Sequence, residues 1–388
     1  METTGREFTD KLRAVWRRLH EFCAAHEWRG YDPYDGLNSP LARLLPGKAA
    51  RQAWTQFHRR SPVNFRPLVG IQPTLNPKAL ALFAMGSGDT KFLDMLEKLR
   101  TPEGGWGYPF DWQSRAFLAP RGTPNLVCTA FAERAFGAAN KTVAAGFSLR
   151  GRDAPVSRAL ETRSSDAPVK GAATERNGTA TVPSAAMTFI EKHLLRERGG
   201  ERWITYIGNS DTQVHNVNMI AAALLGRRDC MEFSVKRQRA DGSWWYGEAE
   251  NQHWIDNFHS GYNLVALKEY EAATGDTGFA EAARRGFQFW DEKFWTAEFA
   301  PRYYHDHDHP FDVHCSAQGI LTYLAFGNLE KANSVARWSL QQMWDERGFF
   351  WYQRGRRSVN RLGYMRWTQA WMYCALAKLI KANETANC

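Results

Sequence analysis

The chain has 388 residues, of which 44% are hydrophobic and 13% aromatic, so it can bury a large core. Its formal net charge of +9 at pH 7 favours an anionic partner, but the basic clusters come with no nucleic-acid-binding motif, so we expect no nucleic acid partner. The sequence shows no apolar run long enough to span a bilayer and no apolar signal region, which argues against a membrane-spanning protein; we expect a bacterial cytoplasmic one.

Two kinds of helical segment alternate along the chain. Amphipathic helices, with Lys, Arg and Glu between their apolar positions, are predicted near 8–27, 88–99, 183–197, 228–239, 277–293 and 328–344. Low-charge helices rich in Ala and Leu are predicted near 76–86, 124–139, 212–226, 256–272, 312–325 and 364–382. The alternation predicts six helical hairpins closed into a ring, with the low-charge helices inside. We therefore expect an all-α fold, an (α/α)6 toroid with little β structure, as a single domain over residues 1–388.

Two segments interrupt this pattern. Residues 28–75 contain Pro33, Pro40, Pro46, Pro62 and Pro67, which makes the first helical pair the least regular. Residues 141–182 are rich in Ser, Thr, Ala, Gly and alternating charges without a helical period, and we predict a disordered insertion there.

Glycine turns mark the passage from an outer helix to an inner one. Glu103-Gly104-Gly105-Trp106, Asp241-Gly242-Ser243-Trp244 and Glu346-Arg347-Gly348-Phe349 each combine an acidic residue, a glycine that permits positive φ and an aromatic residue that can fold back onto the helices. The links that enter inner helices are long, polar and aromatic: 100–123, 198–211, 240–255, 294–311 and 345–363. Because each helical pair reverses direction, all five must emerge on one rim, where we expect a binding cavity.

Polar trios begin several inner helices and supply the catalytic candidates. The spacings i, i+4, i+7 and i, i+3, i+7 place the members of each trio on one helical face. The trios are Asp211, His215 and Asn218, then Asp256, His259 and Asn263, with Asp312, Ser316 and Gly319, flanked by His314 and Gln318, as a looser copy. We predict Asp256 as the acid or base, assisted by His215, His259 or His314. The alternative is structural, because an N-cap aspartate stabilises a helix by about 1 kcal/mol without any substrate, and a histidine can be a satisfied core residue.

Aromatic and polar side chains together predict a carbohydrate site. Flat apolar faces stack on sugar rings, whereas amides, carboxylates and guanidinium groups bind their hydroxyls. The predicted substrate-binding residues are Trp106, Asp111, Asn125, Asp211, Asn218, Trp244, Tyr246, Glu248, Tyr262, Tyr304, Asp312, Arg357 and Arg366. Among these, Tyr262 and Asn125 would orient the substrate, and Arg357 and Arg366 would hold its anionic group.

The six cysteines lie far apart and form no Cys-x-x-Cys pair, so neither a disulfide framework nor a zinc site is indicated. The segment 303–314 alternates His and Asp but matches no recognised metal signature. We expect no metal and no cofactor.

The motifs resemble a known superfamily. The runs 241–244 and 254–263, with Asp312-Val313-His314 and the segment 364–371, are similar to uncharacterised bacterial proteins of the six-hairpin glycosidase-like superfamily. The resemblance covers roughly 75–138 and 200–380, and it implies an (α/α)6 toroid encoded among cell-surface polysaccharide genes. Some of those proteins carry a δ-aminolevulinate dehydratase label, which does not suit this chain because that enzyme is a β/α barrel.

A second resemblance is weaker. Gln238-x-x-Asp241-Gly242-Ser243-Trp244 is similar to the QW repeat of triterpene cyclases, which also form toroids. Those enzymes protonate their substrate through an Asp-x-Asp-Asp motif, and the nearest string here is Asp306-His307-Asp308-His309. Terpene cyclisation is therefore the third hypothesis.

The leading hypothesis is a carbohydrate-active enzyme of surface-polysaccharide metabolism that acts on an anionic sugar as a hydrolase, lyase or epimerase. Hydrolysis needs two carboxyl groups about 5 to 10 Å apart, whereas lysis or epimerisation needs bases around an acidified C–H bond. The alternative from another class is a non-catalytic glycan-binding or scaffold protein.

Overall fold

The computed structural model describes residues 5–150 and 184–386. Its centre is a ring of inner helices that contact each neighbour in turn and close from the last to the first. The inner helices are α3 (Pro77–Ser87), α5 (Leu126–Arg150), α7 (His215–Leu225), α9 (Asn257–Thr274), α11 (Val313–Ala325) and α13 (Trp371–Ala386), the last preceded by the π-helical turn η6 (Met365–Ala370). The (α/α)6 toroid predicted from the alternation of charge is confirmed.

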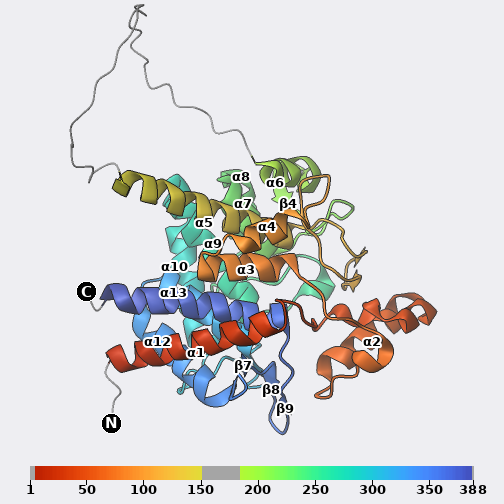
Figure 1. Cartoon of the computed structure of the whole chain (residues 1–388). Coiled ribbons are helices and arrows are strands. Elements are labelled where there is room, and N and C mark those ends of the chain that lie inside the picture. The colour runs from red at the N-terminus through yellow and green to blue at the C-terminus, as the bar shows by residue number, and fades with distance from the viewer. Residues whose placement is uncertain (1–4, 151–183, 387–388) are drawn as a thin grey trace, which may run out of the picture.

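Outer helices pack against the ring (Figure 1). They are α1 (Gly5–Ala25), α4 (Lys91–Glu97), α6 (Ala185–Phe189), α8 (Arg228–Val235), α10 (Ala280–Lys293) and α12 (Leu329–Gln342). Each buries one apolar stripe, as α10 does with Ala282, Ala283, Gly286, Phe289 and Trp290. The inner helices are buried over most of their surface, which explains their low charge.

The glycine turns take the predicted conformation. Gly104, Gly242 and Gly348 all have positive φ, at 93°, 89° and 97°. A Cβ atom on Gly242 would lie 2.5 Å from the carbonyl oxygen of Arg285 on α10, so a larger residue would push the turn off the outer helix. The aromatic residues that follow, Trp106 and Trp244, are buried against the outer helices.

Strands are short and confined to the connections. They are β1 (Trp112–Gln113), β2 (Leu118–Ala119), β3 (Leu195–Arg198), β4 (Glu201–Ile204), β5 (Phe311–Asp312), β6 (Trp344–Asp345), β7 (Phe349–Phe350), β8 (Gln353–Arg354) and β9 (Val359–Asn360). The pairs β1/β2, β3/β4 and β6/β7 and the sheet of β5, β8 and β9 are antiparallel. The helix predicted at 183–197 is wrong in its second half, where a π-helical turn (Ile190–Leu194) leads into the β3/β4 hairpin. Gly199 and Gly200, both at positive φ, form its turn.

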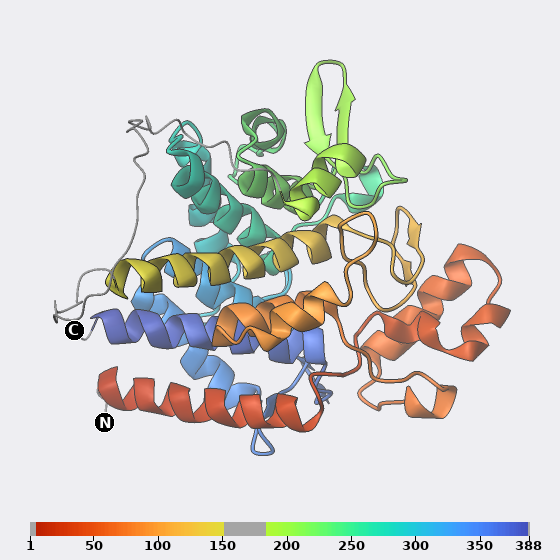
Figure 2. The same cartoon turned by 45° about the horizontal axis from the view of Figure 1, so that its top comes forward.

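Residues 28–75 form an extension at one end of the toroid. It contains the helix α2 (Gly47–Arg60) and the 3-10 turns η1 (Asp35–Asn38), η2 (Pro40–Leu44) and η3 (Pro67–Val69). In Figure 2 the helices α3, α5 and α13 run side by side, and α2 lies beyond their N-terminal ends. A buried ion pair fixes the extension, with Arg66 Nε 2.6 Å from Asp35 Oδ1.

The helix α5 continues to Arg150 and so includes residues 141–150 of the segment 141–182. Residues 151–182, the rest of the predicted insertion, lie outside the described residues. In the described part of the chain, the helices are all too short or too polar to cross a membrane.

Candidate active site

A cavity of about 420 Å³ opens where the inner helices begin. The second residue of every inner helix lines it, counting η6 as the start of the last one. These six residues are, in ring order, Lys78, Val127, Asn216, Phe258, His314 and Arg366. The helices start at one level and run in one direction, so the same position of each faces the toroid axis.

Four of the five long links reach this cavity, from the predicted regions 100–123, 198–211, 240–255 and 294–311. They contribute among others Tyr108, Trp112, Arg115, Tyr206, Tyr246, Trp254, Tyr303 and Tyr304. The link 345–363 contributes no lining residue among those described, but its Tyr352 accepts a hydrogen bond from Arg59 of α2. The prediction of one shared, aromatic rim is confirmed for these four links.

Asp256 and His259 form the first polar pair of the cavity. Asp256 caps α9, since its Oδ1 accepts the backbone N–H of His259 at 3.0 Å. Its Oδ2 lies 2.7 Å from Nδ1 of His259 and accepts a hydrogen bond from Nε1 of Trp254 at 2.9 Å. A carboxylate at Nδ1 assigns the proton to that nitrogen, which leaves Nε2 unprotonated. The Asp256 side chain is 1% exposed and that of His259 is 22% exposed, so the imidazole is the member of the pair that a ligand can reach.

Tyr262 and His314 form the second polar pair. His314 Nδ1 lies 3.1 Å from the carbonyl oxygen of Trp367, which can only accept, so this nitrogen carries the proton. Nε2 then accepts the hydroxyl of Tyr262 at 2.6 Å. Burial, together with the positive charges of Lys78 and Arg366, holds the pKa of His314 well below its usual range. Burial also raises the pKa of the Tyr262 phenol well above its usual range, so this pair is neutral at pH 7.

Both histidines face the same volume. The ring of Phe258 packs 4.1 Å from His259 and 4.8 Å from His314, measured between centroids. The ring of Tyr262 lies 6.0 Å from the first and 6.1 Å from the second. Two acid/base groups with different protonation environments therefore border one cavity.

Positive charge dominates the cavity wall. Its described lining contains the guanidinium groups of Arg59, Arg60, Arg115 and Arg366, and its only carboxylate there is Asp256. The N-terminal ends of the inner helices add the positive ends of their dipoles. The wall thus suits an anionic ligand.

Two arginines are held in place by hydrogen bonds that use only some of their guanidinium N–H groups. Arg59 donates Nε to the hydroxyl of Tyr352 at 3.1 Å and Nη2 to that of Tyr303 at 3.0 Å, and it has no carboxylate partner in residues 5–150 and 184–386. Arg366 is fixed by two hydrogen bonds to Asp32, of 2.5 Å and 2.8 Å, through Nε and Nη2. Each guanidinium is oriented through two nitrogens, which leaves Nη1 for a ligand.

Of the residues predicted from the sequence, seven line the cavity: Tyr246, Asp256, His259, Tyr262, Tyr304, His314 and Arg366. The predicted trio on α7 does not. His215 is buried between Ser234 Oγ of α8 at 3.1 Å and Glu248 Oε1 at 2.8 Å, and Asn218 donates to Ser234 Oγ and to the carbonyl oxygen of Cys230. This face of α7 meets the outer helix, and Asn216 faces the cavity instead.

The other predicted binding residues also lie outside the cavity lining, in structural roles. Trp106 and Trp244 donate their indole N–H groups to carbonyl oxygens of Leu96 and Ser234. Asn125 accepts the N–H of Cys128 at the start of α5, and Asp111 accepts the N–H of Arg121.

The remaining charged candidates also lie outside the cavity lining. Asp211 is exposed and paired with Arg196, and Glu248 binds His215 and Arg237. Arg357 is exposed in the turn between β8 and β9, because the β5, β8, β9 sheet carries that turn away from the ring. Asp312 is buried behind the cavity wall, where it caps α11 and accepts Nε1 of Trp367.

The sequence interpretation missed two groups of residues. Gln52, Thr55, Gln56, Arg59 and Arg60 of α2 line the mouth, although the prolines around α2 gave no sign of it. Lys78 lines the floor, and a lysine near the start of an otherwise low-charge inner helix was the signal that could have identified it.

Five cysteines of the described residues, Cys23, Cys128, Cys230, Cys315 and Cys374, are buried and free, and three of them lie on the inner helices α5, α11 and α13. Across the described ranges, no three His, Cys, Asp or Glu side chains are placed to hold a metal ion.

No protein-family model and no curated protein sequence matches the chain. Solved structures match its fold. The cellobiose 2-epimerase from Bacillus thermoamylovorans B4167 is 9% identical, with a TM-score of 0.53, covering 79% of this chain and 88% of that one. The cellobiose 2-epimerase from Spirochaeta thermophila DSM 6192 is 13% identical, with a TM-score of 0.51, covering 81% and 87%. At such low identity the likeness shows the fold alone: this chain shares the (α/α)6 toroid fold of these two enzymes.

Proposed function

We propose that this protein is a carbohydrate epimerase or isomerase that moves a proton at the carbon next to the carbonyl group of an anionic sugar. The observation that carries the proposal is His259, an imidazole held by Asp256 with Nε2 open to a cavity that has no second carboxylate in its described lining. The structural likeness to two cellobiose 2-epimerases supports the same class of reaction.

The proposed chemistry begins with His259 as the general base. Its Nε2 would take the proton from the acidified C–H bond, and the resulting imidazolium would be stabilised by the carboxylate of Asp256. This differs from the sequence prediction, in which Asp256 itself was the acid or base. The oxygens of Asp256 are already occupied by His259 and Trp254, so a positioning role suits it better.

Tyr262 would act on the substrate oxygen. Its raised pKa keeps the phenol protonated, so it can donate a hydrogen bond as negative charge develops on the carbonyl oxygen. In the structure this hydroxyl donates to His314, whose Nε2 keeps it oriented in the absence of substrate. Return of the proton from His259 to the neighbouring carbon would give an isomer, whereas an epimer would require a second acid to protonate the original carbon on its opposite face.

Hydrolysis fits the cavity less well. A glycosidase needs two carboxyl groups on either side of the scissile bond. The described lining offers only Asp256, which is buried and fully hydrogen-bonded. Of the three reaction types expected from the sequence, lysis and epimerisation begin with abstraction of a proton, and His259 is a candidate base for that step.

The anionic group of the substrate would bind Arg59 and Arg366. Both project unpaired Nη1 groups from rigid positions, and an arginine fork matches a carboxylate or phosphate. We also propose, from the sequence resemblance, that the substrate belongs to surface-polysaccharide metabolism in the bacterial cytoplasm.

The test is hydrogen exchange in D₂O with a panel of uronic acids and sugar phosphates, followed by NMR. We expect deuterium at the carbon next to the carbonyl, with a new epimer or ketose. An unsaturated product would indicate a lyase acting through the same base, and release of reducing sugar from glycosides without exchange would contradict the proposal. Binding of the panel without any exchange would favour the glycan-binding alternative.

A further inference from the structure

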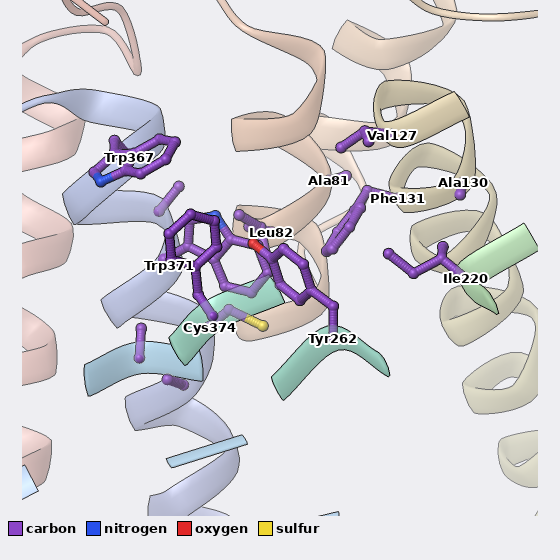
Figure 3. Close-up of a cluster of buried hydrophobic side chains, with 14 of the residues drawn as sticks. Ala81, Leu82, Val127, Ala130, Phe131, Ile220, Tyr262, Trp367, Trp371 and Cys374 are labelled. Atoms are coloured by element: carbon purple, nitrogen blue, oxygen red, sulfur yellow. The ribbon is translucent and has the colours of Figure 1, made fainter. Parts of the chain in front are cut away.

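Lys78 occupies an unusual position for a lysine. It is the second residue of α3, is 3% exposed, and lines the floor of the cavity. Its Nζ lies 4.4 Å from the ring centre of Phe131, 4.7 Å from that of Trp371 and 5.2 Å from that of Tyr262. Figure 3 shows these three rings, from α5, α13 and α9, gathered in one buried cluster.

The side chain lacks an ionic partner. Its one hydrogen bond in the described part of the chain is a long contact of 3.5 Å to the hydroxyl of Tyr262, and no carboxylate there pairs with it. Burial, followed by the nearby charge of Arg366, holds the pKa of Lys78 well below its usual range. The positive end of the α3 dipole disfavours an ammonium group at this position in addition. Both effects favour the free-amine form of Nζ, whose lone pair can act as a nucleophile.

The fold does not require a lysine here. Val127 and Phe258 occupy the equivalent second position of α5 and α9, so an apolar side chain fills this place elsewhere in the same ring. A buried amine costs desolvation energy that a valine or methionine would avoid. A chemical role would explain why a lysine, and not an apolar residue, occupies this buried position.

We propose that Lys78 forms an imine with an aldehyde or ketone held in the cavity. The lone pair of Nζ attacks the carbonyl carbon, the π pair moves to the oxygen, and one proton passes from Nζ to that oxygen to give a neutral carbinolamine. The carbinolamine then loses its hydroxyl group together with the remaining N–H proton as water, which forms the C=N bond, and hydrolysis by water restores both partners. No oxidant or reductant is needed.

The preferred carbonyl compound is a small anionic aldehyde. Arg366 occupies the adjacent position of the ring, since η6 contacts α3, and Arg59 lies at the mouth, so an anionic group would be held while the carbonyl reaches the floor. The imine site does not depend on turnover. It goes beyond the proposed epimerase, although an imine would acidify the same C–H bond that His259 is proposed to deprotonate.

Reductive trapping tests the proposal on the full chain. The protein is incubated at pH 7 with glyoxylate and cyanoborohydride, which reduces an imine to a stable carboxymethyl amine, and the labelled lysines are identified by peptide mass spectrometry. An ordinary lysine is roughly one part in a few thousand free amine at pH 7, so each unit by which the pKa falls gives about tenfold faster labelling. We expect Lys78 to react at least about tenfold faster than the exposed Lys98 and Lys192.

Two controls define the site. Unfolding in urea should remove the advantage of Lys78 over the surface lysines, and the neutral glycolaldehyde should label Lys78 more slowly than glyoxylate does. Labelling of Lys78 at or below the rate of Lys98 and Lys192 in the folded protein overturns the proposal. A negative exchange experiment with sugars leaves it intact, because labelling requires no turnover.

Discussion

The starts of α7 and α9 carry similar polar trios, and the structure uses them in opposite ways. On α9, Asp256 caps the helix and His259 faces the cavity. On α7 the cap is Val214, and the first helical residue is His215, which points at Ser234 of the outer helix. Periodicity identifies residues that share a face, but the residue at which the helix begins decides where that face points.

When positions are counted from the first residue of each helix, the polar trios of α7 and α9 no longer correspond. His215 then corresponds to Asn257, which also faces its outer helix and accepts the indole N–H of Trp290 on α10. Asn216 corresponds to Phe258, and both line the cavity. The polar pattern on α7 is thus a helix-to-helix contact, whereas the pattern on α9 is a site.

The prediction with the largest expected effect compares His259 with His215. His259→Gln removes the proposed base and should lower kcat of the folded protein by about 10²- to 10⁴-fold. His215→Gln should leave kcat of the folded protein unchanged, but it removes a partner from Glu248 and Ser234 and should cost about 1–3 kcal/mol of unfolding free energy. Steady-state kinetics and denaturant unfolding of both variants measure the contrast. Equal loss of activity in the two variants would refute the assignment of roles.

The features that could be predicted from the sequence are those that depend on short-range sequence patterns. The alternation of charged and uncharged helices gave the ring, and the long links gave the rim, because both follow from repeated short-range signals. Gly104, Gly242 and Gly348 adopted the predicted turns for the same reason.

The rest depends on contacts between distant segments. Arg59 reaches the cavity only because α2 is held at the mouth by the pairs Arg66–Asp35 and Arg366–Asp32. No local pattern in 28–75 encodes these pairs, so the sequence suggested Arg357, beside Arg366, as an anion-binding arginine and did not suggest Arg59. In the structure Arg357 is exposed on a turn that the β5, β8, β9 sheet directs elsewhere.

The prediction with an effect of intermediate size compares Arg59 with Arg357. Arg59→Gln should raise KM for an anionic sugar by about 10- to 100-fold, because a charge-assisted hydrogen bond contributes about 1.5–3 kcal/mol. Its effect on a neutral analogue should be small. Arg357→Gln is the matched control and should change neither value. A similar rise in KM for charged and neutral sugars would show that Arg59 acts through the position of α2 and not through the anion.

The smallest expected effect concerns the two capping aspartates. Asp256 and Asp312 both cap inner helices, but Asp256 holds a histidine at the cavity, whereas Asp312 is buried behind Trp367 and Gln353. Burial raises the pKa of Asp312 to about 6, above the value of about 3.9 for an unfolded chain. The folded protein therefore binds this proton more tightly than the unfolded chain does. The stabilising contribution of the protonated form is fully present below about pH 4 and is lost as pH rises through 6.

Asp312→Asn keeps the cap and removes the titration of this carboxyl. It should therefore flatten the fall in unfolding free energy between pH 4 and 6, by an amount on the order of 1 kcal/mol. Urea unfolding at several pH values measures this, with the exposed Asp306→Asn as a control that should leave the pH profile unchanged. An unchanged profile in Asp312→Asn would show that this carboxyl is ionised in the folded protein, and the two caps would then differ only in their neighbours.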